Sequence, residues 1–336
     1  HATLPEPHRR GALAECRGVT SELGAALLGG DRRALARAIT LIESSRADHR
    51  QQAIELLEEL APRAGGALRI AISGTPGVGK STFIESFGSH IVDAGNRLAI
   101  LGDKTRMERL TRDPRAFIRP SPSGGTLGGV AARTREAMLL CEAAGFDVII
   151  VETVGVGQSE TMAAQMTDMF VLLLAPGGGD ELQGIKRGIM ELADLILVNK
   201  ADGPLEHVAN KAVSEYRLAL QLLRPRSEHW KVPVAAVSSL RETGMAESWD
   251  MVCAYRDTMR EQGEIAARRA AQARAWMWAE INDSLAARFR ACTRVREQLD
   301  RVEREVTAGR LPPTTAALRL LDLFQGELPE NKSTGF

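Results

Sequence analysis

The residues Gly74 to Ser81 read GTPGVGKS and match the pattern GxxxxGK[ST] at every required position. A short apolar run typical of a strand, Leu68–Ile72, precedes the motif, and a sequence typical of a helix begins at Ser81. In such a loop, glycines let backbone N–H groups turn toward phosphate oxygens without a Cβ atom in the way, and the helix N-terminus adds donors and partial positive charge. A strand, a phosphate-binding loop and a helix in this order predict an α/β fold.

Two side chains of this loop carry chemistry. Lys80 is predicted to reach the β- and γ-phosphates of a nucleotide, and the hydroxyl of Ser81 to bind Mg²⁺. The alternative is a Gly-rich turn that matches by chance, which the flanking strand and helix disfavour. The predicted phosphate-binding residues are Gly74, Thr75, Pro76, Gly77, Val78, Gly79, Lys80, Ser81 and Thr82.

Short apolar runs alternate with helical stretches between residues 67 and 243. This pattern predicts βαβ units and a largely parallel, buried sheet. We therefore predict a P-loop domain over residues 67–243, an N-terminal helical extension over residues 1–66 and a C-terminal helical region with a loose tail over residues 244–336. The predicted strands are Leu68–Ile72, Val148–Val151, Phe170–Leu174, Leu195–Val198 and Val232–Val237.

A carboxylate stands directly after the apolar run Val148–Val151. P-loop enzymes place a carboxylate at such a strand end beside Mg²⁺, so Glu152 is predicted to bind the metal directly or through water. The alternative for Glu152 is a turn cap. Gly155 and Gly157 follow and predict a flexible loop that can sense a γ-phosphate. Asp103 is a second metal candidate, although an isolated Asp before a helix is more often an N-cap.

The tetrapeptide Asn199-Lys200-Ala-Asp202 follows the apolar run Leu195–Val198 and has the form NKxD. The Asp202 carboxylate can accept two hydrogen bonds from guanine, from N1–H and from the amine at C2. Adenine offers neither donor and leaves a carboxylate unpaired, which costs about 1–3 kcal/mol or more. The sequence therefore predicts a guanine site. After the next strand, Ser238, Ser239 and Leu240 suit the loop that backs the base, and a plain Ser-rich turn is the alternative.

Composition excludes several other classes of protein. The 43 basic and 43 acidic residues give a formal net charge of zero, and only 4% of residues are aromatic, so we expect neither nucleic acid nor an anionic membrane as a partner. The apolar run Met169–Pro176 is too short to span a bilayer. The four cysteines form no CxxC pair, and the histidines show no ligand spacing, so a reducing, cytoplasmic location without a zinc site is expected.

With these motifs in view, the chain resembles the MeaB family of P-loop GTPases, which includes the type A cobalamin (MMAA) proteins and the proteins once called ArgK. The resemblance extends from about Leu35 to the C-terminal helices. The segments that carry it are 36–43, 74–82, 101–107, 119–128, 151–158, 177–186 and 199–202.

The resemblance implies an activity and partners. Proteins of this family bind GTP or GDP with Mg²⁺, hydrolyse GTP, and serve an adenosylcobalamin-dependent mutase, methylmalonyl-CoA mutase, by gating cofactor loading and protecting the mutase. The resemblance also implies a homodimer built through the C-terminal helices. It further implies that residues 177–186 form a switch that couples the nucleotide to the partner, with Lys186 as its charged member.

One segment departs from the family pattern. The family carries a further stretch after the second strand, with an Asp-Pro-Ser-Ser core whose Asp lies on the metal side, whereas here Asn96–Asp103 continues without it. A true deletion removes a metal-side carboxylate and is expected to weaken hydrolysis. The alternative is that residues between Ala99 and Ile100 are absent from the sequence. This alternative is considered because a strand of about four residues that passes at once into a helix is shorter than typical strands.

Three other readings stay open. A metallochaperone GTPase is disfavoured because the chain has neither a His-rich tract nor a clustered Cys motif. A small-molecule P-loop kinase leaves the NKxD tetrapeptide unexplained. A non-catalytic GTP-binding adaptor is harder to exclude, because no arginine finger can be assigned.

The long C-terminal helical stretch carries several large apolar residues, namely Trp276, Met277, Trp278, Leu285 and Phe289. They predict burial against a second copy of the chain, or packing within the chain.

Overall fold

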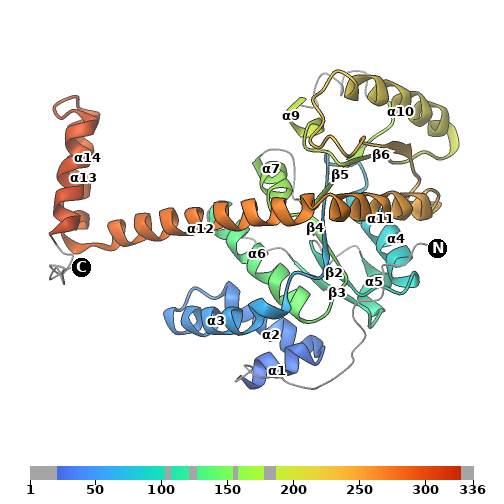
Figure 1. Ribbon diagram of the computed structural model, residues 1–336. Coiled ribbons are helices and arrows are strands. Elements are labelled where there is room, and N and C mark those ends of the chain that lie inside the picture. Colours follow the sequence, from blue (N-terminus) through green and yellow to red (C-terminus); the bar gives the residue numbers. More distant parts are fainter. Residues whose placement is uncertain (1–20, 103–106, 121–126, 154–157, 178–186, 327–336) are drawn as a thin grey trace. The chain divides into compact units, whose positions relative to one another are not determined.

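A computed structural model describes residues 21–102, 107–120, 127–153, 158–177 and 187–326. Its core is a sheet of seven parallel strands in the order β3-β2-β4-β1-β5-β6-β7 (Figure 1). The α/β fold with a parallel sheet is therefore confirmed. The strands are β1 Leu68–Gly74, β2 Leu98–Leu101, β3 Ala116–Arg119, β4 Val148–Glu152, β5 Met169–Leu174, β6 Leu195–Val198 and β7 Val234–Ala236.

The central strands are buried along their whole length. Every residue of β2, β4, β5 and β6 is buried, as expected for strands covered by helices on both faces. Strand β1 lies in the middle, between β4 and β5, so the phosphate-loop motif begins at the centre of the sheet. Because all pairs are parallel, the carboxyl ends of the strands share one edge, and polar residues that follow different strands are brought together there.

Helices cover the sheet and extend the chain at both ends. Helices α2 and α3 pack against α6, while α4 packs against β1, β2, α5 and α11. The helices are α1 Glu22–Leu28, α2 Arg32–Glu43, α3 Ala47–Leu60, α4 Lys80–Asp93, α5 Glu108–Arg112, α6 Leu127–Ala143, α7 Gln158–Ala164, α9 Arg187–Met190, α10 Glu206–Leu220, α11 Met245–Glu261, α12 Glu264–Ala291, α13 Thr293–Thr307 and α14 Pro313–Gln325, with 3₁₀ turns η1 Ala61–Arg63 and η3 Gly203–Leu205.

Strands β2 and β3 add to the five predicted apolar runs, and β2 lies within Asn96–Asp103, where a strand of about four residues was considered. Each has four residues, which is close to the lower limit of strand length. Turn residues do precede both strands, Gly95-Asn96 before β2 and Asp113-Pro114 before β3. Strand β2 pairs with β3 on one side and β4 on the other, and it passes through Ala99 and Ile100 as one continuous strand.

The chain divides into two compact units, residues 1–272 and residues 273–336. The first contains the sheet, together with α11 and the first turns of α12. The second has a small core of its own, in which Phe289 of α12 contacts Phe324 of α14, and Cys292, Val295 and Leu320 are buried. The predicted three-part division at residues 66 and 243 stays a prediction.

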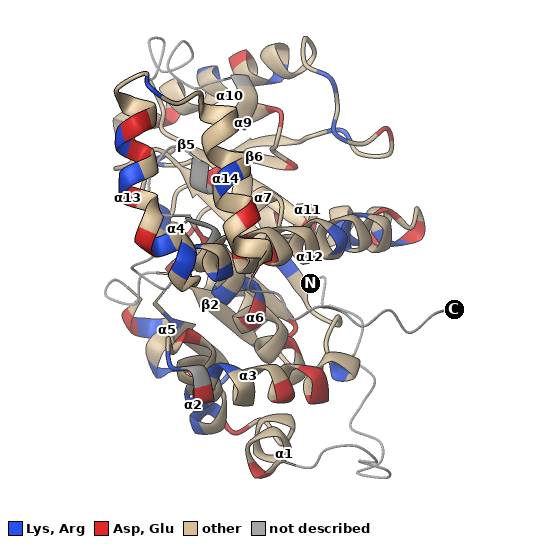
Figure 2. Ribbon diagram, turned by 90° about the vertical axis from the view of Figure 1, so that its left-hand side faces the viewer, with Lys and Arg blue, Asp and Glu red and all other residues tan. Residues whose placement is uncertain are grey.

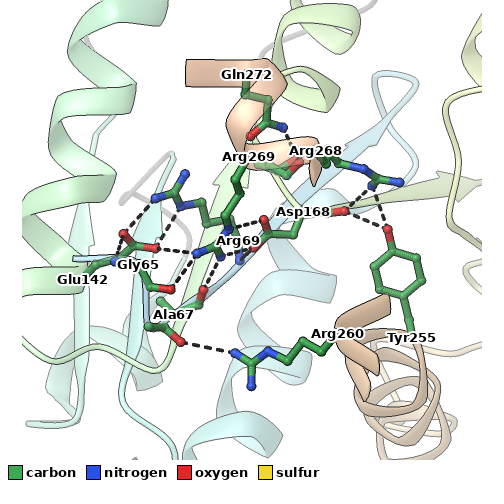
Figure 3. A network of polar contacts seen from close by, with 12 residues as sticks. Gly65, Ala67, Arg69, Glu142, Asp168, Tyr255, Arg260, Arg268, Arg269 and Gln272 are labelled. Atoms are coloured by element: carbon green, nitrogen blue, oxygen red, sulfur yellow. Dashed lines mark hydrogen bonds and ion pairs between the residues drawn. The ribbon is translucent and has the colours of Figure 1, made fainter. Parts of the chain in front are cut away.

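The first turns of α12 are fastened to the amino-terminal edge of the sheet by a polar network (Figure 3). The fully buried Asp168, directly before β5, accepts a hydrogen bond from Arg269 Nε at 2.7 Å and one from the backbone N–H of Arg69 in β1 at 2.9 Å. Arg69 in turn pairs with the buried Glu142 of α6 at 2.8 Å, and Gln272 donates to the backbone oxygen of Thr167. This network lies at the edge opposite to the carboxyl ends of the strands.

Charged residues are mixed in sign over the helices. Figure 2 shows acidic and basic residues interspersed along α13, while α2 carries mainly basic residues and α3 mainly acidic ones, in agreement with the formal net charge of zero. Across the described ranges, no helix combines the length and the hydrophobicity that crossing a bilayer requires.

Candidate nucleotide site

The phosphate loop turns between β1 and α4 through positions that require glycine. Gly77 and Gly79 have φ angles of 83° and 92°, in the left-handed region that favours residues without a Cβ atom. A Cβ atom on Gly74 would lie 2.4 Å from the backbone oxygen of Leu173 in the neighbouring strand β5, so the close approach of the two strands also depends on glycine. The backbone conformation therefore accounts for the glycines of the motif.

Lys80 is the first residue of α4 and points back over the loop. Its Nζ donates a hydrogen bond to the backbone oxygen of Gly74 at 2.7 Å, so the ammonium group spans the loop in which a phosphate would lie. Burial lowers the pKa of Lys80, while the carboxylates of Glu152 and Glu160 act in the opposite direction. A bound phosphate would add negative charge beside the ammonium group and favour its charged form.

A hydroxyl and a carboxylate meet next to this loop. Ser81 Oγ donates to Glu152 Oε1 at 3.2 Å, and Glu152 is buried at the carboxyl end of β4. Oxygen atoms of this kind are the ligands that Mg²⁺ prefers, and Mg²⁺ keeps several waters and phosphate oxygens, so two protein ligands suffice. The pair therefore fits a magnesium ion. Gly102 follows β2 at the same place, and a Cβ atom there would lie 2.7 Å from Glu152 Oε2.

Asn199 joins the base side of the site to the phosphate loop. Its Nδ2 donates to the backbone oxygen of Val78 at 2.9 Å, and the neighbouring Lys200 donates from Nζ to the backbone oxygen of Gly77 at 2.7 Å. Lys200 has a φ angle of 62°, which is uncommon for a residue with a side chain and marks a constrained turn after β6. A Cβ atom on Gly79 would lie 2.9 Å from Asn199 Nδ2, so this contact also requires a glycine in the loop.

The loop after β7 contacts the NKxD segment through two serines. Ser239 donates to Asn199 Oδ1 twice, from its backbone N–H at 3.1 Å and from Oγ at 2.7 Å, and Ser238 Oγ donates to Asp202 Oδ2. Both serines are buried, whereas the side chain of Leu240 is 80% exposed. These contacts hold the amide of Asn199 and the carboxylate of Asp202, and the role of this loop in backing a base stays a prediction.

The structure thus gathers most of the predicted site residues at the carboxyl edge of the sheet. The residues from the phosphate loop, from the end of β4 and from the loops after β6 and β7 lie there in one connected group. Asp103, Gly155, Gly157 and Lys186 fall outside the described residues.

Sequence reasoning did not single out three polar residues of this region. Glu160 is fully buried on α7 and acts electrostatically on Lys80. Thr153 Oγ1 donates to Ser73 Oγ at 2.9 Å and ties the end of β4 to β1. Ser86 of α4 donates from Oγ to the backbone oxygen of Ser239 at 2.8 Å. The only signal for Ser86 was a polar residue between apolar ones on the buried face of a helix.

Other features of the described residues lie apart from this site. A cavity of about 650 Å³ with mainly apolar walls is lined by residues of α9, α10, α11 and β7 and of the segment before β7, and it contains none of the predicted site residues. Across the described ranges, no group of three or more His, Cys, Asp and Glu residues gathers as a metal site would require, and Cys141, Cys253 and Cys292 are buried free thiols.

Comparisons with known proteins show the family and the fold of the chain. Residues 35–294 match the model of a family described as methylmalonyl-CoA mutase-associated GTPase MeaB. A Caulobacter vibrioides relative named as a GTPase is 52% identical over 312 residues, covering 89% of this chain and 95% of the relative. The mouse protein named methylmalonic aciduria type A homolog, mitochondrial, is 44% identical over 348 residues, covering 96% of this chain and 84% of the relative. A solved structure titled LAO/AO transport system kinase has 36% identity and a TM-score of 0.75, covering 91% of this chain and 99% of its own.

Proposed function

The chain belongs to the MeaB family of methylmalonyl-CoA mutase-associated GTPases, and we propose that it acts as a Mg²⁺-dependent GTP switch for an adenosylcobalamin-dependent mutase. In this role, GTP binding and hydrolysis gate the loading of the mutase cofactor and protect the mutase from inactivation. The proposed partner is methylmalonyl-CoA mutase, which the family description names. The proposed compartment is the cytoplasm, on the widely spaced cysteines alone; the mouse relative is mitochondrial by name.

The observation that carries the nucleotide assignment is the hydrogen bond from Asn199 Nδ2 to the backbone oxygen of Val78. It joins a base-reading segment to a phosphate-binding loop, so one ligand with both a base and phosphates can occupy the two together. Asp202 then accepts hydrogen bonds from N1–H and from the C2 amine of guanine, and Ser238 holds its carboxylate in place. Leu240 presents its backbone N–H in the same loop, where it can donate to the guanine oxygen at C6.

The phosphates and the metal occupy the other half of the proposed site. The backbone N–H groups of the loop and Lys80 bind the phosphate oxygens, while Ser81 and Glu152 hold Mg²⁺. The ion, when bound, neutralises negative charge on the phosphates. Asp103 as a further metal ligand, and Lys186 as part of a switch that couples the nucleotide to the mutase, remain proposals from the resemblance.

A second part of the proposal is a homodimer. On the part of α12 that belongs to the second unit, Met277, Trp278, Ile281 and Leu285 recur at helical spacing and are each more than a third exposed. Large apolar side chains grouped on one helix face mark a surface that another protein covers. A second copy of this chain, related by a two-fold axis, would cover this face with an identical one.

The experiment that tests the mutase role measures phosphate release from GTP with and without purified methylmalonyl-CoA mutase, together with co-sedimentation of the two proteins in GDP and in a non-hydrolysable GTP analogue. We expect complex formation that depends on the nucleotide, and faster hydrolysis in the complex. GTP hydrolysis without any binding to the mutase, in either nucleotide, would contradict the partner while leaving the GTPase assignment intact.

A further inference from the structure

Ser86 is a buried polar residue on the helix that begins at the phosphate loop. It lies on α4, six positions after Lys80, next to Phe83 and Phe87, which stack on each other in the core, and it is 7% exposed. Its Oγ donates to the backbone oxygen of Ser239 at 2.8 Å, across 153 positions of the sequence. A buried hydroxyl is costly unless it is hydrogen-bonded, and here its partner belongs to the loop that is proposed to back the base.

This hydrogen bond is one part of a closed ring. Ser239 uses its backbone N–H and its Oγ on Asn199, and Asn199 Nδ2 donates to Val78 in the phosphate loop. Two positions after Val78, α4 begins and leads back to Ser86. The N–H, the hydroxyl and the carbonyl of Ser239 are therefore all hydrogen-bonded, which restrains the orientation of the peptide that follows it.

The ring fixes the direction of one backbone donor. In a trans peptide, the C=O of Ser239 and the N–H of Leu240 lie in one plane and point in opposite directions. Because the C=O points to α4, the N–H of Leu240 points away from the helix. Within the described part of the chain, this N–H has no hydrogen-bond partner, and the Leu240 side chain is exposed beside it. The donor thus faces the open side of a loop whose Ser238 binds the base-reading carboxylate of Asp202.

We propose that Ser86 is a positioning residue for base recognition, which aims the N–H of Leu240 at the oxygen on C6 of guanine. This inference rests on the proposed guanine site and adds a residue that does not touch the nucleotide. Guanine carries an acceptor at C6, and adenine carries an amine there, so a fixed donor at this place rejects adenine independently of Asp202. The same helix that presents Lys80 to the phosphates thereby sets the geometry of base reading.

The test compares nucleotides that differ at single atoms. In 6-thio-GDP the oxygen on C6 is replaced by sulfur, a weaker acceptor, and in IDP the C2 amine is absent. For the unaltered protein, we expect 6-thio-GDP to bind roughly 3- to 10-fold more weakly than GDP, the value of one hydrogen bond. In Ser86→Ala, the ratio of the dissociation constant of 6-thio-GDP to that of GDP should fall below about twofold. The ratio of the dissociation constant of IDP to that of GDP reports on Asp202 and should not change. Affinities are measured by competition with a fluorescent GDP analogue.

Two further variants complete the design. Ser86→Cys keeps the size of the side chain and donates weakly, so its 6-thio-GDP ratio should lie between those of the unaltered protein and Ser86→Ala, and it serves if Ser86→Ala does not fold. Ser214→Ala removes an exposed serine hydroxyl that bonds a backbone oxygen within α10 and should change neither ratio.

The possible outcomes distinguish a failure of the proposed role of Ser86 from a failure of the proposed guanine site. An unchanged 6-thio-GDP ratio in both Ser86 variants would overturn the role of Ser86, and so would an equal loss of both ratios, because that result means general loosening of the site. If the unaltered protein does not prefer GDP to ADP, the guanine site itself is wrong.

Discussion

Burial and nearby carboxylates shift the pKa of Lys80 in opposite directions, and Lys80 is the residue proposed to anchor the phosphates. Burial lowers its pKa, and Glu152 and Glu160 oppose this effect. The ammonium group is already placed by its hydrogen bond to the oxygen of Gly74, so it needs little rearrangement to meet a phosphate. Such preorganised charge is the main contribution that a P-loop makes to binding and hydrolysis.

Replacing Lys80 is therefore expected to remove most of the activity. In Lys80→Ala, GTP hydrolysis should fall by about 100- to 1000-fold, the loss typical of one preorganised donor. Phosphate release and binding of a fluorescent GDP analogue measure the effect. Lys211→Ala, on the exposed surface of α10, is the matched control and should behave as the unaltered protein. Full activity in Lys80→Ala would show that the phosphate loop is assigned wrongly.

Asp202 is the residue that we propose to select the base. In Asp202→Asn, an amide replaces one carboxylate oxygen and presents N–H donors to the N1–H and C2 amine of guanine. Xanthine carries an oxygen at C2 and suits this amide. We expect GDP affinity to fall by roughly 5- to 100-fold, from one unpaired buried polar group, and XDP affinity to rise. Competition between GDP and XDP for the site measures both. GDP affinity that stays intact would contradict the assignment of the base.

At the scale of elements, the first turns of α12 and the amino ends of β1 and β5 are joined by polar contacts. Arg269 of α12 pairs with Asp168 before β5, and Asp168 also accepts from the backbone of β1 (Figure 3). The side chain of Asp168 is fully buried, and Arg269 is the charged side chain that contacts it there. The pair fixes where α12 leaves the sheet, and β1 and β5 are the strands that carry the phosphate loop and its neighbour.

Breaking this pair is expected to destabilise the fold strongly. Arg269→Ala leaves a buried carboxylate without its main partner, and the free energy of unfolding should fall by about 3–5 kcal/mol. Arg46→Ala breaks an ion pair with Asp48 that is more than half exposed, and should cost under about 1 kcal/mol. Urea denaturation followed by circular dichroism gives both values. Equal effects of the two substitutions would mean that the network does not hold α12.

Strands β2 and β3 show where periodicity stops being informative. Strands β2 and β3 have four residues each, and such short apolar runs do not differ from stretches of buried helix or turn. The pairing with β4 is what identifies β2 as a strand, because the backbone of β4 pairs with β2 on one side and with β1 on the other. Strand β2 forms by pairing with β4, and β3 forms by pairing with β2, so both strands extend the sheet.

At the scale of the whole molecule, the exposed apolar face of α12 predicts self-association. Introducing charge there, in the double variant Ile281→Asp and Leu285→Asp, should convert a dimer into a monomer, because buried unpaired carboxylates oppose the contact. Sedimentation velocity at several protein concentrations measures this change. Leu222→Asp alters an equally apolar but separate exposed residue near the end of α10 and should leave the dimer intact. A monomeric unaltered protein would contradict the proposed homodimer.

The sequence by itself determined the parts of this protein that rest on consecutive residues. The phosphate loop is one of them, because its glycines and Lys80 act through the backbone conformation of a few neighbouring positions. The NKxD segment is another, because the hydrogen-bonding pattern of an Asp carboxylate already distinguishes guanine from adenine. The central strands were also predictable, because full burial in a parallel sheet requires apolar runs.

Only the tertiary structure decided which of these parts meet. Asn199 contacts Val78 across 121 positions, Ser86 contacts Ser239 across 153, and Arg269 contacts Asp168 across 101. No local pattern encodes such pairs, because they follow from the order of strands in the sheet, which places the loops after β1, β6 and β7 at one edge and α12 at the other. The residues proposed to read a ligand were therefore visible in the sequence, whereas the residues that contact them from distant parts of the chain appeared only when the chain was folded.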